Sequence, residues 1–122
     1  MKFIFWILVC TLLGGMTAYA GEAEIVDVKV KMTDRDTYSF DVTVRHADAG
    51  WKHYADKWDV VAPDGTVLGT RTLYHPHVDE QPFTRSISGV KIPASIEQVT
   101  IRAHDLVHGY CGKTVTVAVP AN

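Results

Sequence analysis

Most of the chain beyond residue 20 consists of short segments in which apolar and polar residues alternate. Between Ile25 and Met32 every second residue is apolar (Val26, Val28, Val30, Met32), and Asp27, Lys29 and Lys31 stand between them. Successive side chains of a β-strand point to opposite faces, so this alternation predicts a strand whose valines and Met32 face a core. No helical periodicity lasts longer than two turns beyond residue 20. The pattern predicts an all-β protein.

The same reasoning predicts seven strands joined by polar turns. They cover residues 25–32, 38–44, 58–61, 66–73, 83–88, 98–104 and 113–119. Their expected inward residues include Phe40, Val42 and Val44 on the second strand, Trp58 on the third, Val99, Ile101 and Ala103 on the sixth, and Val115, Val117 and Val119 on the seventh. Seven short strands in a domain of this size predict an antiparallel sandwich of the immunoglobulin or fibronectin-III type. A Greek-key barrel is the alternative.

Residues 1–20 have the composition of a signal peptide. Lys2 precedes an apolar run over residues 3–13, and Ala18-Tyr19-Ala20 has the small-x-small pattern that signal peptidases cleave after. We therefore expect an exported protein, periplasmic or secreted, whose mature chain starts at Gly21 and forms one sandwich domain over residues 21–122. A retained N-terminal anchor is the alternative. No later segment is apolar and long enough to span a bilayer.

Charge and motifs exclude several classes of function. The formal net charge is −2 for the whole chain and becomes slightly more negative without Lys2, which does not suit a nucleic-acid binder. The chain carries no nucleophile elbow, no phosphate-binding glycine loop and no paired metalloprotease histidines. Hydrolytic and nucleotide-dependent chemistries are therefore not indicated.

The expected topology brings three loops to one end of the sandwich. Successive connections alternate between the two ends, so residues 46–57, 75–82 and 105–112 share one end, and the turns at Asp34, Asp64 and Ala94 share the other. The first end carries most of the chemically active side chains and the second has no histidine. We expect a functional site, if there is one, at the histidine end.

A transition-metal site is the first interpretation of this end. His75 and His77 flank Pro76, and residues two apart in an extended segment point the same way. Imidazole, thiolate and carboxylate bind copper, zinc and iron. The expected ligands are His53, His75, His77 and His108, with Cys111 or Glu80 as a fifth. His46 and His104, at strand ends, rank behind them.

Cys111 has three open roles. Removal of residues 1–20 would take away Cys10 and leave Cys111 as the only cysteine, so no disulfide within the mature chain is expected. It could be an exposed thiol, the bridge of a dimer or a metal ligand.

Two short segments resemble the desulfoferrodoxin and superoxide reductase family. His53-Tyr54 before Trp58, with His46 upstream, is similar to the histidine–tyrosine–tryptophan segment of that family, and Ala103 followed by His108-Gly109 is similar to its later iron-binding loop. The resemblance implies an immunoglobulin-like sandwich and an iron site of four histidines and one cysteine. Asp105 stands where that cysteine would be. The chain also resembles small uncharacterised exported bacterial sandwich proteins.

Three functions stay open on the sequence alone. The first is a metal carrier, sensor or redox centre that uses the histidines. The second is a recognition module that binds a protein or a sugar through Trp51, Tyr54, Tyr74, Phe83 and Tyr110. The third is a redox enzyme on the same metal site.

Overall fold

A computed structural model describes residues 21–121 of the chain. The predicted signal peptide and its cleavage point lie outside these residues. Over residues 21–121 the secondary structure consists of strands, turns and loops, and no helix there is long and apolar enough to cross a membrane. The all-β prediction is confirmed.

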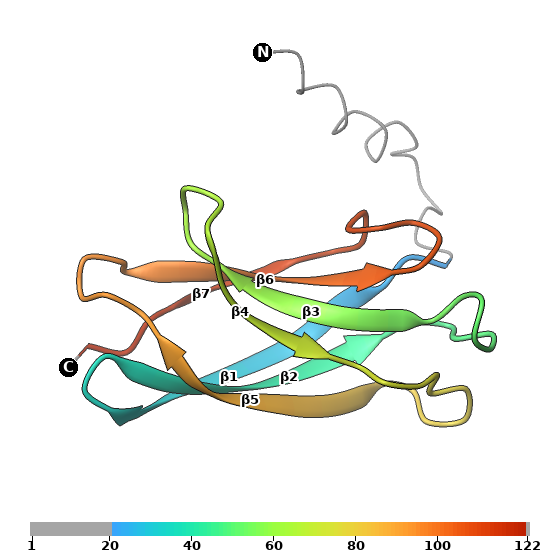
Figure 1. The fold of residues 1–122 in the computed structure, drawn as a ribbon, viewed down its shortest axis with the longest axis horizontal. Helices are drawn as coiled ribbons and strands as arrows, with labels where there is room; N and C mark the ends of the chain where they lie inside the picture. Colours follow the sequence, from blue (N-terminus) through green and yellow to red (C-terminus); the bar gives the residue numbers. More distant parts are fainter. Residues whose placement is uncertain (1–20, 122) are drawn as a thin grey trace, which may run out of the picture.

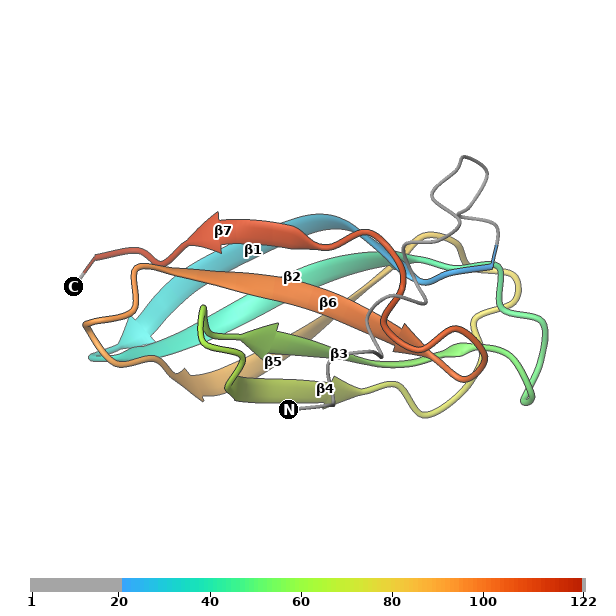
Figure 2. The same cartoon turned by 90° about the horizontal axis from the view of Figure 1, so that it is seen from above.

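The strands form two antiparallel sheets that pack face to face (Figures 1 and 2). One sheet has the order β1-β2-β5 and the other the order β4-β3-β6-β7. The bounds are β1 Glu24–Asp34, β2 Thr37–Arg45, β3 Ala55–Val61, β4 Val67–Thr72, β5 Phe83–Lys91, β6 Gln98–Asp105 and β7 Val115–Ala118. In a constant-type immunoglobulin domain the fourth strand joins the first sheet, whereas here β4 pairs with β3.

The core lies between the sheets and contains the residues that the alternation predicts on β2, β3 and β6. Trp58, Phe40 and Ile101 are fully buried, together with Val42, Val44 and Val99. The valines of β7 pack against this core and are partly buried. Burial of each large apolar side chain stabilises the fold by about 1.5–3 kcal/mol.

The prediction of which side chains of the first strand face the core is partly wrong. Val26 and Met32 are exposed, by 38% and 36%, and Ile25 is buried. A register shift between Ile25 and Asp27 inserts a bulge in β1, and a second shift follows Met32. An extra residue in a strand reverses the direction of the side chains beyond it, so alternation alone could not place Ile25 and Val26.

Two strand boundaries differ from the prediction by three residues. β3 begins at Ala55, which pairs with Asp105, and not at Trp58. β5 continues to Lys91, through Gly89, which was expected to start a loop. Gly89 has a φ of +72°, and the register with β2 shifts near it, so the glycine allows a bulge instead of ending the strand.

Three loops and the start of β1 meet at one end of the sandwich, on the right in Figure 1. These are the β2–β3, β4–β5 and β6–β7 connections, as the topology predicted. Ile25 donates a backbone hydrogen bond of 2.9 Å to the carbonyl of Lys113, which fixes the start of β1 beside the β6–β7 connection. Four segments distant in sequence therefore surround one small volume.

Candidate metal centre

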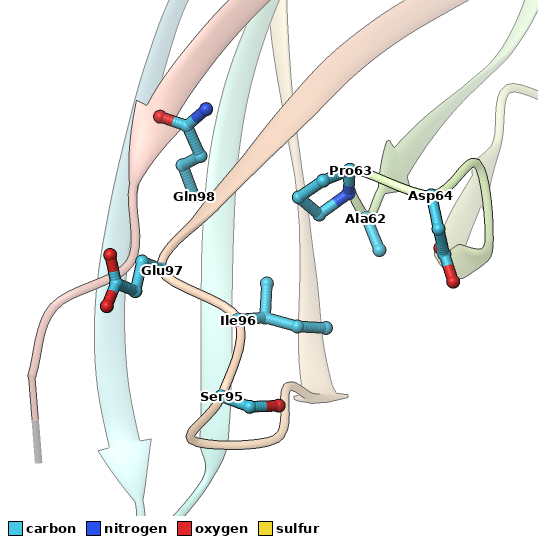
Figure 3. A pocket seen from close by; sticks show the side chains of 7 residues that line it. All are labelled: Ala62, Pro63, Asp64, Ser95, Ile96, Glu97 and Gln98. Carbon is cyan, nitrogen blue, oxygen red and sulfur yellow. The ribbon is translucent and has the colours of Figure 1, made fainter.

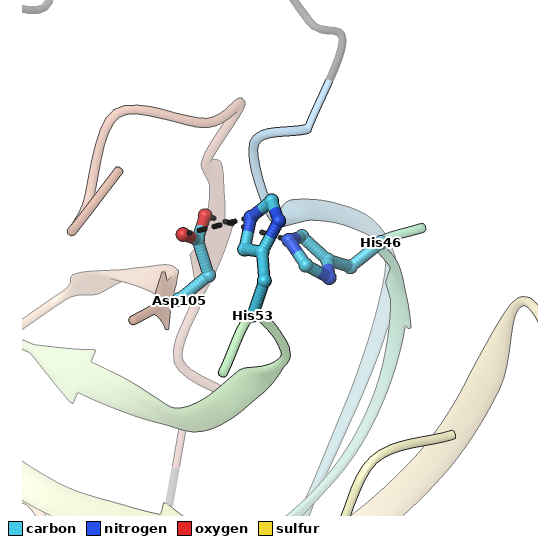
Figure 4. A group of neighbouring side chains, drawn as sticks. All are labelled: His46, His53 and Asp105. Carbon is cyan, nitrogen blue, oxygen red and sulfur yellow. Dashed lines mark ion pairs between the residues drawn. The ribbon is translucent and has the colours of Figure 1, made fainter. Parts of the chain in front are cut away.

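His46, His53 and Asp105 form a compact group at this end (Figure 4). His46 follows β2, His53 lies in the β2–β3 loop and Asp105 ends β6. One ligand atom from each lies within 4.8 Å of the others. Nε2 of His46 is 3.6 Å from one Asp105 oxygen, and Nε2 of His53 is 3.5 Å from the other. No other such group of three ligating side chains occurs within residues 21–121.

Backbone amides hold the Asp105 carboxylate in place. Oδ1 accepts hydrogen bonds from the amides of Val107 and His108, at 2.8 and 2.6 Å, and Oδ2 accepts one from Ala23 at 3.3 Å. The side chain is fully buried. A buried carboxylate is costly unless its oxygens are hydrogen-bonded, and here the residue before β1 and the β6–β7 turn supply the donors.

Asp48 orients His46 from the other side of the ring. Nδ1 of His46 donates to Oδ1 of Asp48, whose two oxygens also accept from the amides of Ala55, at 3.1 Å, and His77, at 2.6 Å. Both side chains are buried. In proteins, a carboxylate on the far nitrogen of a histidine fixes the ring and raises its basicity as a metal ligand.

Both ring nitrogens of His46 face acceptors, because Nε2 lies 2.8 Å from the carbonyl oxygen of Gly21. A ring that donates at both nitrogens is an imidazolium. Burial lowers the pKa of His46, but the hydrogen bond to Asp48 and the charges of Asp48 and Asp105 raise it more, so the net shift is upward. A metal ion at Nε2 would displace this proton.

His108 flanks the group. Its Nδ1 lies 3.3 Å from Asp105 Oδ1, and its ring centroid lies 5.2 Å from that of His53. This nitrogen is buried and has no hydrogen-bond partner within the described part of the chain. His108 is therefore the nearest additional imidazole to the group.

The expected pair His75 and His77 lies apart from this group. Their rings are 4.7 Å apart, so they do lie together. His77, however, is buried against Phe83 with the rings stacked 3.9 Å apart, and Arg85 donates to its Nε2 at 2.9 Å. Burial and the charge of Arg85 lower the pKa of His77. The neutral ring thus already uses its accepting nitrogen.

Glu80 and His104 have other partners as well. Glu80 forms an ion pair of 3.5 Å with Arg85, and His104 Nδ1 donates to Asp56 at 2.6 Å. His104 also lies edge-on to Tyr110. Within the described residues, neither side chain belongs to the compact group.

Cys111 is disulfide-bonded, so in this structure its sulfur is neither an exposed thiol nor an available metal ligand. The expectation that no disulfide forms within the chain assumed removal of residues 1–20.

The aromatic residues expected on a partner surface separate into two kinds. Trp51 and Tyr74 are exposed, by 66% and 75%, and Tyr54 is half-buried against Trp51. Phe83, in contrast, is a core residue. The Tyr110 hydroxyl donates to the buried Asp59 at 2.7 Å. Exposed apolar side chains on the same three loops also include Val78, Leu106 and Val107.

A surface hollow at the opposite end of the sandwich has a different character (Figure 3). Its lining residues are Ala62, Pro63, Asp64, Ser95, Ile96, Glu97 and Gln98. The carboxylates of Asp64 and Glu97 are the titratable groups of this set, and it contains no histidine. Among the described residues, this end has no ligand set comparable with that in Figure 4.

The sequence placed His53 and His108 at this end, whereas it ranked His46 behind other histidines and did not single out Asp105 as a candidate ligand. His46 was ranked lower because it was expected at the end of a strand, in an outward or edge position. In the structure it is only 2% exposed. The sequence signal for Asp105 was its place at the start of the loop 105–112, which was expected at this end.

Comparisons with known proteins identify one relative by sequence and one solved structure with a similar fold. No family model matches the chain. Over 96 residues it is 40% identical to a protein of Halomicrobium mukohataei named "Putative lipoprotein", a match that covers 79% of this chain and 47% of that protein. The chain thus spans about half the length of that relative.

A solved structure gives a match at the level of the fold. The crystal structure of hypothetical protein PH1083 from Pyrococcus horikoshii OT3 matches with a TM-score of 0.50 and 12% identity, over 83% of this chain and 94% of that one. This likeness concerns the fold alone. The resemblance to the desulfoferrodoxin family gains no support from these comparisons. The chain is therefore a β-sandwich similar in sequence to part of a protein named as a lipoprotein.

Proposed function

We propose that the protein binds a transition-metal ion through His46, His53 and Asp105. The observation that carries the proposal is the convergence of two imidazole nitrogens and a buried carboxylate within 4.8 Å. In a tetrahedral site with bonds of about 2.0–2.2 Å, neighbouring ligand atoms lie roughly 3.4 Å apart. His46 Nε2 and His53 Nε2 lie 3.6 and 3.5 Å from different oxygens of Asp105, so each histidine is near this distance from the carboxylate. One set of three ligand atoms spans up to 4.8 Å and would contract when an ion binds.

The surroundings support a metal site over a merely structural cluster. Asp48 holds His46 by its far nitrogen, as carboxylates do behind metal-bound histidines. His108 lies close enough to Asp105 to supply a further ligand after a small rotation. Two histidines and a carboxylate suit zinc, copper(II) or iron(II), the three metals that the sequence suggested.

A periplasmic or secreted location is part of the same proposal. The composition of residues 1–20 supports export, and the relative named as a lipoprotein agrees with a place outside the cytoplasm. Such a protein would serve as a metal carrier or sensor. If the ion is iron or copper, a redox reaction becomes the next activity to assay.

The test is metal analysis of the protein purified from its own compartment without chelators or a histidine tag. We expect near-stoichiometric metal in the unaltered protein and its loss in His46→Ala and His53→Ala. His104→Ala is the matched control, because His104 also pairs with an aspartate at this end but stands outside the group. Absence of metal, with no binding at micromolar concentrations on titration, would reject the proposal.

A recognition function is a second candidate, favoured by one observation. Trp51, Tyr74, Val78, Leu106 and Val107 are exposed apolar residues on the loops around the group. Exposed aromatic residues gathered on loops are typical of partner-binding surfaces. Trp51→Ala and Tyr74→Ala should then weaken binding of a protein or sugar partner and leave metal content unchanged.

A further inference from the structure

Gly21, the first residue of the predicted mature chain, lies against the histidine group. Its carbonyl oxygen is 2.8 Å from Nε2 of His46 and 3.3 Å from Nε2 of His53. A methyl group added at its Cα would lie only 2.9 Å from Cε1 of His108 and 3.6 Å from Cε1 of His53. The backbone of Gly21 therefore touches three imidazoles, and a larger residue would not fit there.

Contacts beyond Gly21 fix this position. Ala23 is fully buried and donates its amide hydrogen to Asp105, and Ile25 bonds to Lys113. The Ala23 carbonyl packs so tightly on Gly112 that a Cβ there would lie 1.7 Å from the oxygen. These contacts join residues within 21–121, and they hold the start of β1 against the β6–β7 connection.

We propose that signal-peptide cleavage after Ala20 creates a further metal ligand, the α-amino group of Gly21. This inference rests on the proposed metal function and on the predicted cleavage site. Water adds across the Ala20–Gly21 amide bond, which leaves a carboxylate on Ala20 and an α-ammonium group on Gly21. The ammonium loses its proton when a metal binds, which is easy near neutral pH because such groups have pKa values of about 7.7–8.0.

The amine and carbonyl of Gly21 can then bind one ion together. An α-amine and the carbonyl of the same residue close a five-membered ring with a metal. Cis ligands with bonds of about 2.1 Å lie roughly 2.9–3.4 Å apart, and the carbonyl of Gly21 is at 2.8 and 3.3 Å from the two histidine nitrogens. The donors would thus be the α-amine, a carbonyl, two imidazoles and Asp105.

The space beside Gly21 is open enough for an ion to enter. A hollow lined by Gly21, Glu22, Glu24, His46 and Gln81, among others, lies at the surface next to the group. The lining also includes Arg45, which pairs with Glu24 at 3.4 Å, so the hollow gives access to the group without an excess of negative charge from that pair. Metal loading would then follow export, because the complete ligand set exists only after cleavage.

The test compares two exported proteins, one unaltered and one with a single serine inserted between Ala20 and Gly21. The insertion keeps Ala18-Tyr19-Ala20 and moves the new amine one residue away from the group. Intact mass gives the first residue of each protein. Copper(II) affinity is measured by competition titration, and the electron paramagnetic resonance spectrum is recorded with and without ¹⁵N-glycine labelling.

We expect the inserted protein to bind copper(II) at least about tenfold more weakly, because loss of a group that only supports a ligand already costs 10–100-fold. We also expect a ¹⁵N-glycine signature in the unaltered protein alone. Equal affinities, weaker binding without that signature, or a mature chain that does not start at Gly21 would each overturn the inference and leave the three-residue site standing. Absence of binding in both proteins would reject the metal function itself.

Discussion

Asp48→Asn is the substitution that most sharply separates a metal site from a structural cluster. Asp48 is buried and accepts three hydrogen bonds, from His46 Nδ1 and from the amides of Ala55 and His77. Asparagine has the same shape, but its side-chain NH2 group cannot accept a hydrogen bond. One of the three N–H groups that bond to Asp48 would therefore face another donor. Loss of one bond to a buried charged group, with a donor left unpaired, costs about 1–3 kcal/mol of unfolding free energy.

The metal affinity should fall as well. Asp48 does not touch the proposed ion, but it fixes the ring of His46, and removal of such a partner lowers metal affinity by about 10–100-fold. This corresponds to about 1.4–2.7 kcal/mol of binding free energy. The measurement is zinc or copper(II) competition titration near pH 8, where protons compete little for the histidines.

The metal-free proteins should also differ in their dependence on pH. The fold lowers the pKa of Asp48 and raises that of His46. The stabilising effect of Asp48 is lost as the pH falls through its lowered pKa, and that of charged His46 is lost as the pH rises through its raised pKa. The difference in unfolding free energy between the unaltered protein and Asp48→Asn should be largest between these two values.

Asp56→Asn is the matched control, since Asp56 accepts from His104 in the same kind of pair, outside the group. It should leave metal affinity within about twofold, since His104 is not a proposed ligand. If Asp48→Asn keeps full metal affinity, or if both variants lose it equally, the role given to Asp48 is wrong.

Three other substitutions test the fold and the surface. Trp58→Ala should reduce the unfolding free energy in urea by about 3–5 kcal/mol, because it empties a fully buried site between the sheets; a loss below about 1 kcal/mol would contradict that packing. Tyr110→Phe removes a 2.7 Å hydrogen bond to the buried Asp59 carboxylate and should cost about 1.5–3 kcal/mol, measured in the same way. Trp51→Ala should change the unfolding free energy by less than about 0.5 kcal/mol, since this side chain is largely exposed. A larger loss would show that Trp51 packs against other residues.

The fold could be predicted from the sequence because alternation follows directly from the geometry of strands. Phe40, Trp58 and Ile101 stand at alternating positions of regular strands, and all three are buried as expected. Val26 was misplaced because a bulge in β1 reverses the side to which the neighbouring side chains point. Nothing in the local sequence pattern reveals this bulge. The end of β5 was missed because a glycine that permits a bulge looks the same as one that starts a loop.

The site could be predicted only as a location. Strand order brings the three loops together, so the histidine end followed from topology alone. Which histidines converge depends on contacts that spacing does not encode. His75-Pro76-His77 is the most conspicuous pair in the sequence, but His77 is fixed by Phe83 and Arg85. Asp105 becomes a candidate ligand only because β6 ends beside His53.

The central claim is that His46, His53 and Asp105 hold a metal ion. Anomalous X-ray diffraction from crystals of the exported protein, recorded at the absorption edge of the metal found by elemental analysis, tests it most directly. We predict one strong peak about 2.0–2.2 Å from Nε2 of His46, Nε2 of His53 and an oxygen of Asp105. A peak between His75 and His77, or no peak in protein that has been supplied with metal, would contradict the account.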